Sequence, residues 1–145
     1  MKKRRAGFTL LEIIIVIIIL GILAALAIPR LFSTVEFSKA AEALNAFVSI
    51  RQSMERCYVS SSLGGGTGSF SGNCDAMSKL DIDDPSNSTG SNFTYTIDAT
   101  TAGVNYYEIT AAYKTGSAND FIKLTYDGTN NSITKTGSGI FARIK

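Results

Sequence analysis

Phe-Thr-Leu-Leu-Glu-Ile-Ile-Ile-Val-Ile-Ile-Ile-Leu-Gly-Ile-Leu-Ala-Ala-Leu-Ala-Ile, residues 8–28, is an apolar run of 21 residues that carries a single charge, Glu12. As an α-helix rising about 1.5 Å per residue, this run would cover roughly 30 Å, the hydrocarbon thickness of a bilayer. Four basic residues, Lys2 to Arg5, precede the run and predict that the N-terminus stays in the cytoplasm. The sequence therefore predicts one membrane-spanning helix, followed by a region that is exported.

Glu12 is the unusual residue of this run. A carboxylate surrounded by lipid costs about 2.5–3.5 kcal/mol near the bilayer centre and less near its edge. Pairing with a cation offsets that cost, whereas one buried charge left alone is strongly unfavourable. From the physics alone, Glu12 either has such a partner or reaches the headgroups as an ordinary charge near a helix end.

The motif Gly7-Phe8-Thr9-Leu10-Leu11-Glu12 follows a short basic leader, and Gly-Ile-Leu-Ala-Ala-Leu-Ala-Ile-Pro follows at residues 21–29. This combination resembles the N-terminus of type IV pilins and pseudopilins, and the resemblance covers residues 1–43. It implies that prepilin peptidase cleaves between Gly7 and Phe8 and methylates Phe8, the new N-terminal residue. It also implies that Glu12 pairs with the Phe8 ammonium of a neighbouring subunit in a filament. The alternative is a secretory signal peptide that is removed whole.

The resemblance implies three parts: a leader at residues 1–7, a transmembrane and filament-core helix at 8–29, and a periplasmic or extracellular globular pilin domain at 30–145. Two residues weaken the helix, because a mid-helix glycine such as Gly21 costs about 1 kcal/mol relative to alanine, and Pro29 lacks a backbone donor. In this family the region between them resembles one that loses helical order in the filament. A simple kink is the alternative.

Composition limits the chemistry available to the chain. It has 14 basic and 12 acidic residues, but loss of the four leader cations leaves 10 against 12, a net charge near −2. We therefore predict no nucleic-acid partner. The chain has no histidine, which excludes Ser-His and Cys-His catalysis and histidine-based metal sites. We expect no enzyme, no catalytic residue, no cofactor and no metal.

The helix is predicted to continue after the anchor, from about Thr9 to about Cys57. Apolar residues beyond Arg30 recur at spacings of three and four, which predicts one apolar stripe that packs on a sheet. The residues of the stripe are Ala40, Ala41, Leu44, Phe47, Val48, Met54 and Tyr58.

A loop rich in glycine and serine, residues 60–73, separates Cys57 from Cys74. In an exported domain two such cysteines predict a disulfide, which would stabilise the fold by roughly 3 kcal/mol; two free thiols are the alternative. The carboxylates of the segment Asp81–Asn87 could in principle bind calcium. Their spacing does not fit an EF-hand, and we interpret the segment as a solvated acidic loop.

From Asn92 onward the apolar pattern has a period of two, and turn signals separate the runs. Short connections imply antiparallel neighbours, so we predict four or five strands with one face covered by the second half of the helix. This α+β arrangement matches the pilin fold. The runs are 93–97, 107–110, 121–126, 133–136 and 140–144.

The resemblance implies a structural subunit of a helical filament of identical chains. Its implied partners are the inner membrane of a bacterium before assembly, prepilin peptidase, an assembly ATPase and an inner-membrane platform protein. After assembly the chain would lie in a cell-surface pilus or a periplasmic pseudopilus. The alternatives are a pseudopilin of a type II secretion system and a minor pilin with an adhesive or DNA-binding role. Motility, adhesion, DNA uptake, secretion and conduction all remain open as the biological role.

Overall fold

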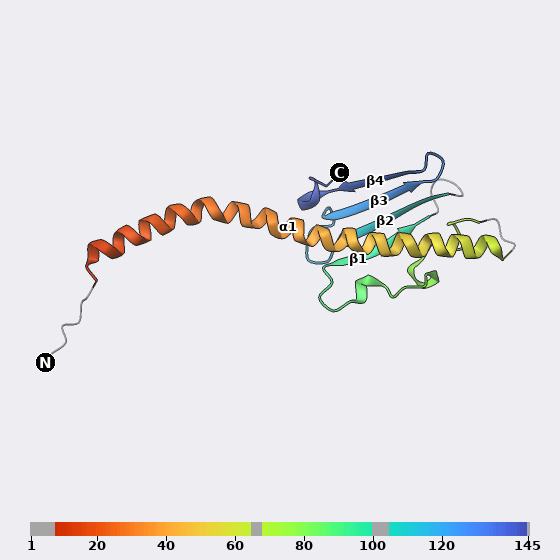
Figure 1. The fold of residues 1–145 in the computed structure, drawn as a ribbon, viewed down its shortest axis with the longest axis horizontal. Coiled ribbons are helices and arrows are strands. Elements are labelled where there is room, and N and C mark those ends of the chain that lie inside the picture. The colour runs from red at the N-terminus through yellow and green to blue at the C-terminus, as the bar shows by residue number, and fades with distance from the viewer. Residues whose placement is uncertain (1–7, 65–67, 100–104, 145) are drawn as a thin grey trace. The chain divides into compact units, whose positions relative to one another are not determined.

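The computed structural model describes residues 8–64, 68–99 and 105–144. Within these residues there is one α-helix, α1 (Leu10–Leu63, 54 residues), and one four-stranded antiparallel sheet (Figure 1). The chain divides into two compact units, Met1–Val35 and Glu36–Lys145. The predicted α+β class with a long N-terminal helix is confirmed.

Helix α1 begins at Leu10, close to the predicted start at about Thr9. It ends at Leu63, beyond the predicted end at about Cys57. The extra turns contain serines, which we had assigned to the loop. Two of these hydroxyls donate to the carbonyl oxygen of Tyr58, Ser61 Oγ at 2.8 Å and Ser62 Oγ at 3.0 Å. Serine can bond to the preceding turn in this way and so remain inside a helix.

The sheet is a meander in the order β1-β2-β3-β4. Each strand pairs with its successor in the chain, with Ile97 opposite Ile109 and Leu124 opposite Lys135. Alternate residues of β1, β2 and β3 are buried, as expected for a sheet that is covered on one face. The bounds are β1 Phe93–Asp98, β2 Tyr106–Tyr113, β3 Phe121–Asp127 and β4 Ser132–Gly137.

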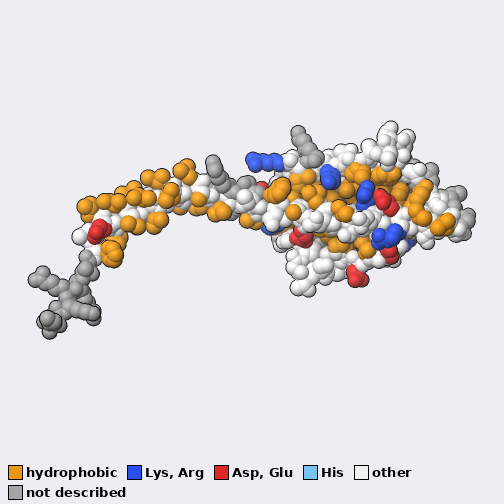
Figure 2. Space-filling model, in the orientation of Figure 1, with side chains coloured by type: hydrophobic (Ala, Val, Ile, Leu, Met, Phe, Trp, Pro, Cys, Tyr) orange, Lys and Arg blue, Asp and Glu red, His pale blue; other side chains and the backbone are white. Residues whose placement is uncertain are grey.

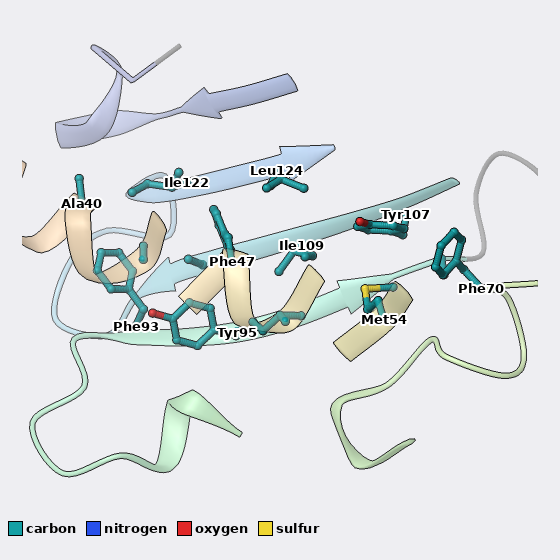
Figure 3. Packing of buried hydrophobic residues seen from close by; sticks show 14 of the residues in the cluster. Ala40, Phe47, Met54, Phe70, Phe93, Tyr95, Tyr107, Ile109, Ile122 and Leu124 are labelled. Atoms are coloured by element: carbon teal, nitrogen blue, oxygen red, sulfur yellow. The ribbon is translucent and has the colours of Figure 1, made fainter. Parts of the chain in front are cut away.

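The core of the second unit lies between the sheet and the part of α1 that belongs to this unit (Figure 3). Phe47 and Met54 from α1 are almost completely buried, and they share the core with Tyr107 and Ile109 from β2. The predicted stripe is wrong at Val48, which is 51% exposed, and it missed Ala43 and Ile50, which are fully buried. Phe47 and Val48 are adjacent, so the helix places them on different faces.

The fifth run, residues 140–144, is not a strand. It begins with the short 3-10 helix η3 (Gly139–Phe141), and the sheet therefore has the lower number of strands that we predicted. Phe141 is 2% exposed and packs against Phe93, with a ring-centroid distance of 5.5 Å. The run reaches the edge of β4 by one bond, from Gly137 N to the carbonyl oxygen of Ile144 at 3.1 Å. The segment therefore buries the ring of Phe141 and does not pair with β4 as a fifth strand.

The described part of the first unit is helical from Leu10 onward and exposes its apolar side chains (Figure 2). Leu10–Ile28 is long and apolar enough to cross a membrane, and none of that stretch is buried inside the chain. The apolar side chains of Leu10–Ile28 are therefore free to contact lipid or other helices, as expected for a helix that is apolar on all sides.

Candidate functional site

Glu12 caps the N-terminus of its own helix. The backbone N–H and the hydroxyl of Thr9 both donate to Glu12 Oε2, at 2.8 and 2.9 Å. In return, the backbone N–H of Glu12 donates to Thr9 Oγ1 at 3.2 Å. This reciprocal pattern is a capping box, in which the N-cap and the third helical residue satisfy each other's backbone N–H groups.

The capping box leaves one carboxylate oxygen for another partner. Within the described residues, both bonds that Thr9 donates to the carboxylate reach Oε2, and none reaches Oε1. Phe8 lies beside this turn and is 84% exposed. Gly7, where processing is predicted, lies outside the described residues. Glu12 Oε1 can therefore accept a hydrogen bond from another donor while Oε2 keeps its bonds to Thr9.

Gly21 and Pro29 both lie inside α1, which the structure shows as one helix from Leu10 to Leu63. A Cβ added at Gly21 would meet no atom within 4 Å. Contacts within the chain therefore do not require a glycine there. The prediction that this region loses helical order on assembly stays a prediction.

The second unit contains the predicted disulfide between Cys57 and Cys74, which joins α1 to the segment after the glycine-rich loop. Asp81 makes a second connection between the same parts of the chain. Its carboxylate accepts from Arg56 Nε at 2.7 Å and Arg56 Nη2 at 2.8 Å, and also from the hydroxyl of the buried Ser53. The bonds from Arg56 and then from Ser53 hold the pKa of Asp81 well below its usual range.

The acidic segment that we considered for calcium is used for local bonding. Asp81 is held by Arg56, and Asp84 accepts from Ser86 N at 2.8 Å at the start of the 3-10 helix η2 (Pro85–Asn87). No cluster of three or more potential metal-binding side chains is found in the part of the chain that the structure describes.

Sequence reasoning missed several residues that fix this geometry. Thr9 received no predicted role, although Thr-x-x-Glu before an apolar run is the pattern of a capping box. Ser53 and Asp81 lie 28 positions apart, and their contact has no short-range signal. The same is true of Glu42, whose carboxylate accepts from Asn92 N at 2.9 Å and Asn92 Nδ2 at 2.6 Å.

Comparison with known proteins supports the interpretation of the N-terminal region. A family model described as the prokaryotic N-terminal methylation motif matches residues 2–28, which include Gly7, Phe8 and Glu12. The chain is 41% identical over 54 residues to the type II secretion system core protein G of Aeromonas hydrophila, which covers 37% of this chain and 38% of that protein. The N-terminal region of the chain is therefore similar to those of type II secretion core proteins and type IV fimbrial proteins, and it carries the methylation motif.

These relatives are named either as secretion-system core proteins or as fimbrial proteins. The chain is 37% identical over 59 residues to the type IV major fimbrial protein FimA of Dichelobacter nodosus, 41% of this chain and 38% of that one. A core protein G of Pseudomonas aeruginosa is 47% identical over 38 residues, 26% and 27% of the two chains. The chain thus spans less than half the length of the curated relatives it matches, and no solved structure matches it.

Proposed function

We propose that this chain is the structural subunit of a type IV pilus-like filament. Prepilin peptidase cleaves between Gly7 and Phe8 and methylates Phe8. In the filament, Glu12 of one subunit pairs with the Phe8 ammonium of its neighbour. The observation that carries the proposal is a single carboxylate near the start of the apolar segment Leu10–Ile28, none of which is buried inside the chain. Thr9 donates to only one oxygen of this carboxylate.

The energetics indicate that the Glu12–Phe8 pair selects the correct stagger between subunits more than it strengthens their association. Lipid tails are as apolar as the side chains of another helix, so moving Leu10–Ile28 from lipid into a bundle gives little hydrophobic gain. An unpaired carboxylate in that bundle is costly, and a paired one is tolerated. Subunit arrangements that bring Glu12 to a neighbour's Phe8 ammonium are therefore selected over those that do not. Extraction from the membrane would need work, which an assembly ATPase and a platform protein would supply.

Before assembly the subunit would be held in the inner membrane by Leu10–Ile28, the segment that is long enough to span it. The proposed role is structural, with no enzymatic step. The methylation motif and the names of the relatives, a fimbrial protein and a secretion-system core protein, support this proposal.

The test replaces Glu12 by Ala in the full-length chain. We expect normal processing and abundant inserted subunit in the membrane fraction, with filaments lost from sheared material. Glu36→Ala is the matched control, because it removes a carboxylate from the same helix outside the apolar segment, and it should leave filaments intact. Normal filaments from the Glu12→Ala chain would refute the pairing.

A pseudopilin of a type II secretion system is the second candidate. It is favoured by the fact that core protein G from several organisms, Dickeya chrysanthemi and Klebsiella pneumoniae included, is among the relatives. Deletion of the gene distinguishes the two. Loss of surface filaments with normal export of secreted enzymes indicates a pilin, and the reverse result indicates a pseudopilin.

A further inference from the structure

The two sulfur atoms of the disulfide lie in different surroundings. Cys74 is 0% exposed, whereas Cys57 on α1 is only partly buried. The residue before Cys74, Asn73, places its carbonyl oxygen 3.5 Å from Cys57 Sγ at the protein surface. A thiol from solution attacks one sulfur of a disulfide directly, so access decides which of the two is attacked.

Cys57 lines a polar groove that opens at the surface. The groove has a volume of about 400 Å³. Cys74 does not line it. The other lining residues are Arg56, Ser60, Ser61, Asn73, Lys79 and Asp81.

Cys74 is held on the core side of the bond. Its backbone N–H donates to the carbonyl oxygen of Phe70 at 2.9 Å. The ring of Phe70 is 5% exposed and packs against Tyr107, with ring centroids 4.8 Å apart. A thiol could reach Cys74 Sγ only after this corner of the core opens, and such local openings cost free energy.

The fold has a second attachment that survives loss of the disulfide. Asp81 is bound by Arg56 through two bonds and by Ser53, on the same stretch of α1 that carries Cys57. The intervening segment is cross-linked by Lys79, whose ammonium donates to Asp75 at 2.6 Å and to the carbonyl oxygen of Gly72 at 2.8 Å. The segment that carries Cys74 thus stays next to α1 when the S–S bond is open.

We propose that Cys57 Sγ is a thiol–disulfide exchange site of the folded protein, open to a thiol or to the first thiol of a dithiol protein. The attacking thiolate forms a bond to Cys57 Sγ, the Cys57–Cys74 bond breaks, and Cys74 leaves as a thiolate that takes up a proton. A dithiol then completes the reduction: its second thiolate attacks the mixed disulfide and releases Cys57. Two electrons pass from the dithiol to the disulfide, which becomes two thiols.

Cys74 acts as the resolving group in the reverse direction. Because the Asp81 attachment keeps it beside Cys57, its thiolate can attack the mixed disulfide and expel the incoming thiol. The exchange site is therefore selective for one sulfur and self-closing.

The test treats the full-length chain in detergent micelles with excess glutathione, quenches it with iodoacetamide, and maps both cysteines. Chymotrypsin cleaves after Phe70 and so separates Cys57 from Cys74 for mass spectrometry. We expect glutathione on Cys57 and the alkyl group on Cys74, in an excess of roughly tenfold or more over the opposite pattern. Equal labelling, or glutathione mainly on Cys74, would overturn the proposal.

A urea series tests whether glutathione reacts with the folded protein or with unfolded chains. The rate of the glutathione reaction should not change at low urea concentrations. A rate that rises steeply from zero urea would show that only unfolded chains react. In parallel, Cys74→Ser and Cys57→Ser each leave one free thiol and no disulfide. The thiol of Cys74→Ser should react with an aromatic disulfide reagent roughly tenfold faster than that of Cys57→Ser. Equal rates without urea would contradict the assignment.

Discussion

The apolar start of α1 and the globular unit are stabilised by different means. None of Leu10–Ile28 is buried inside the chain, whereas Glu36–Lys145 encloses an aromatic core between helix and sheet. Yet it is residues 2–28 that match a family model. Burial inside the chain gives Leu10–Ile28 no reason to keep a particular sequence. Under the proposed function, the reason is instead contact with a membrane, a processing enzyme and other copies of the chain.

This contrast predicts that substitutions in the two regions fail in different assays. A change in the N-terminal motif should abolish processing or assembly and leave the globular unit folded. A change in the core should lower the free energy of unfolding and leave processing unaffected. The predictions below test that separation.

The largest effect is expected for Gly7→Val, which places a branched side chain at the predicted cleavage site. We expect the precursor to accumulate uncleaved and filaments to disappear, because a site built around glycine has no room for a side chain. Intact-mass measurement of the membrane-extracted protein checks the result. Gly21→Val is the matched control, since a Cβ at Gly21 meets nothing within the chain, and it should be cleaved normally.

Phe47→Ala should destabilise the globular unit by about 3–5 kcal/mol, the usual cost of truncating a buried aromatic side chain. Phe47 is 1% exposed, and its ring meets that of Tyr95 edge to face at 6.3 Å. Val48→Ala removes the adjacent, exposed side chain and should change stability by about 0.5 kcal/mol or less. Thermal unfolding followed by near-UV circular dichroism in micelles compares the two variants. Similar losses in both would mean that α1 is not oriented as described.

The same pair of residues shows how far sequence reasoning could go. The periods of the apolar residues predicted the helix and the strands, and the short connections between the runs predicted their antiparallel order, because both are local features of the sequence. Val48 was wrongly assigned to the buried stripe, because the spacing of an apolar residue at the edge of a stripe is compatible with the buried face and with the exposed face. The run at 140–144 was misread because the burial of Phe141 depends on Phe93, a residue far away in the sequence. The bonds from Ser53 and Arg56 to Asp81 were missed for the same reason.

Asp81→Asn should make the globular unit less stable at neutral pH and less sensitive to acid. The pKa of Asp81 is lowered in the folded state by the bonds from Arg56 and Ser53. Its contribution is therefore complete above the unfolded pKa, near 3.9, and is lost as pH falls toward the folded pKa. Unfolding of wild type should take up as much as one proton more than unfolding of the variant in that range.

Urea unfolding measured between about pH 2 and 7 detects this difference. Asp83→Asn provides the comparison, because Asp83 is an exposed carboxylate in the same segment. The free energy of unfolding of Asp83→Asn at neutral pH should match that of wild type within about 0.5 kcal/mol. If Asp81→Asn and Asp83→Asn behave alike, the bonds to Asp81 contribute nothing to stability.

Thr9→Val should loosen the first turn of α1 without affecting the globular unit. The variant keeps the shape of the side chain but removes the hydroxyl that donates to Glu12 Oε2 and accepts from Glu12 N. Loss of an N-cap typically costs about 1 kcal/mol, so the amide of Glu12 should exchange with solvent about fivefold faster. Hydrogen exchange of the labelled chain in micelles measures it. Thr9→Ser restores the hydroxyl and should restore protection; unchanged exchange in Thr9→Val would contradict the capping box.

The smallest change in the free energy of unfolding is expected for a substitution at Tyr107, and the sign of that change is the informative result. Its hydroxyl is buried and, within the described residues, has no hydrogen-bond partner. Burial raises the pKa of the same group. Removing a buried polar atom that bonds to nothing is neutral or favourable, so Tyr107→Phe should leave stability unchanged or raise it by up to about 1 kcal/mol.

The preceding residue on β2 provides the control. The hydroxyl of Tyr106 donates to Glu108 Oε1 at 2.7 Å, and this bond raises the pKa of Tyr106 to about 12. Tyr106→Phe removes a bond to a charged acceptor and should destabilise by about 1 kcal/mol. Urea unfolding of the two variants therefore gives effects of opposite sign from the same substitution at adjacent positions. If Tyr107→Phe is the more damaging of the two, the hydroxyl of Tyr107 has a hydrogen-bond partner that stabilises the core.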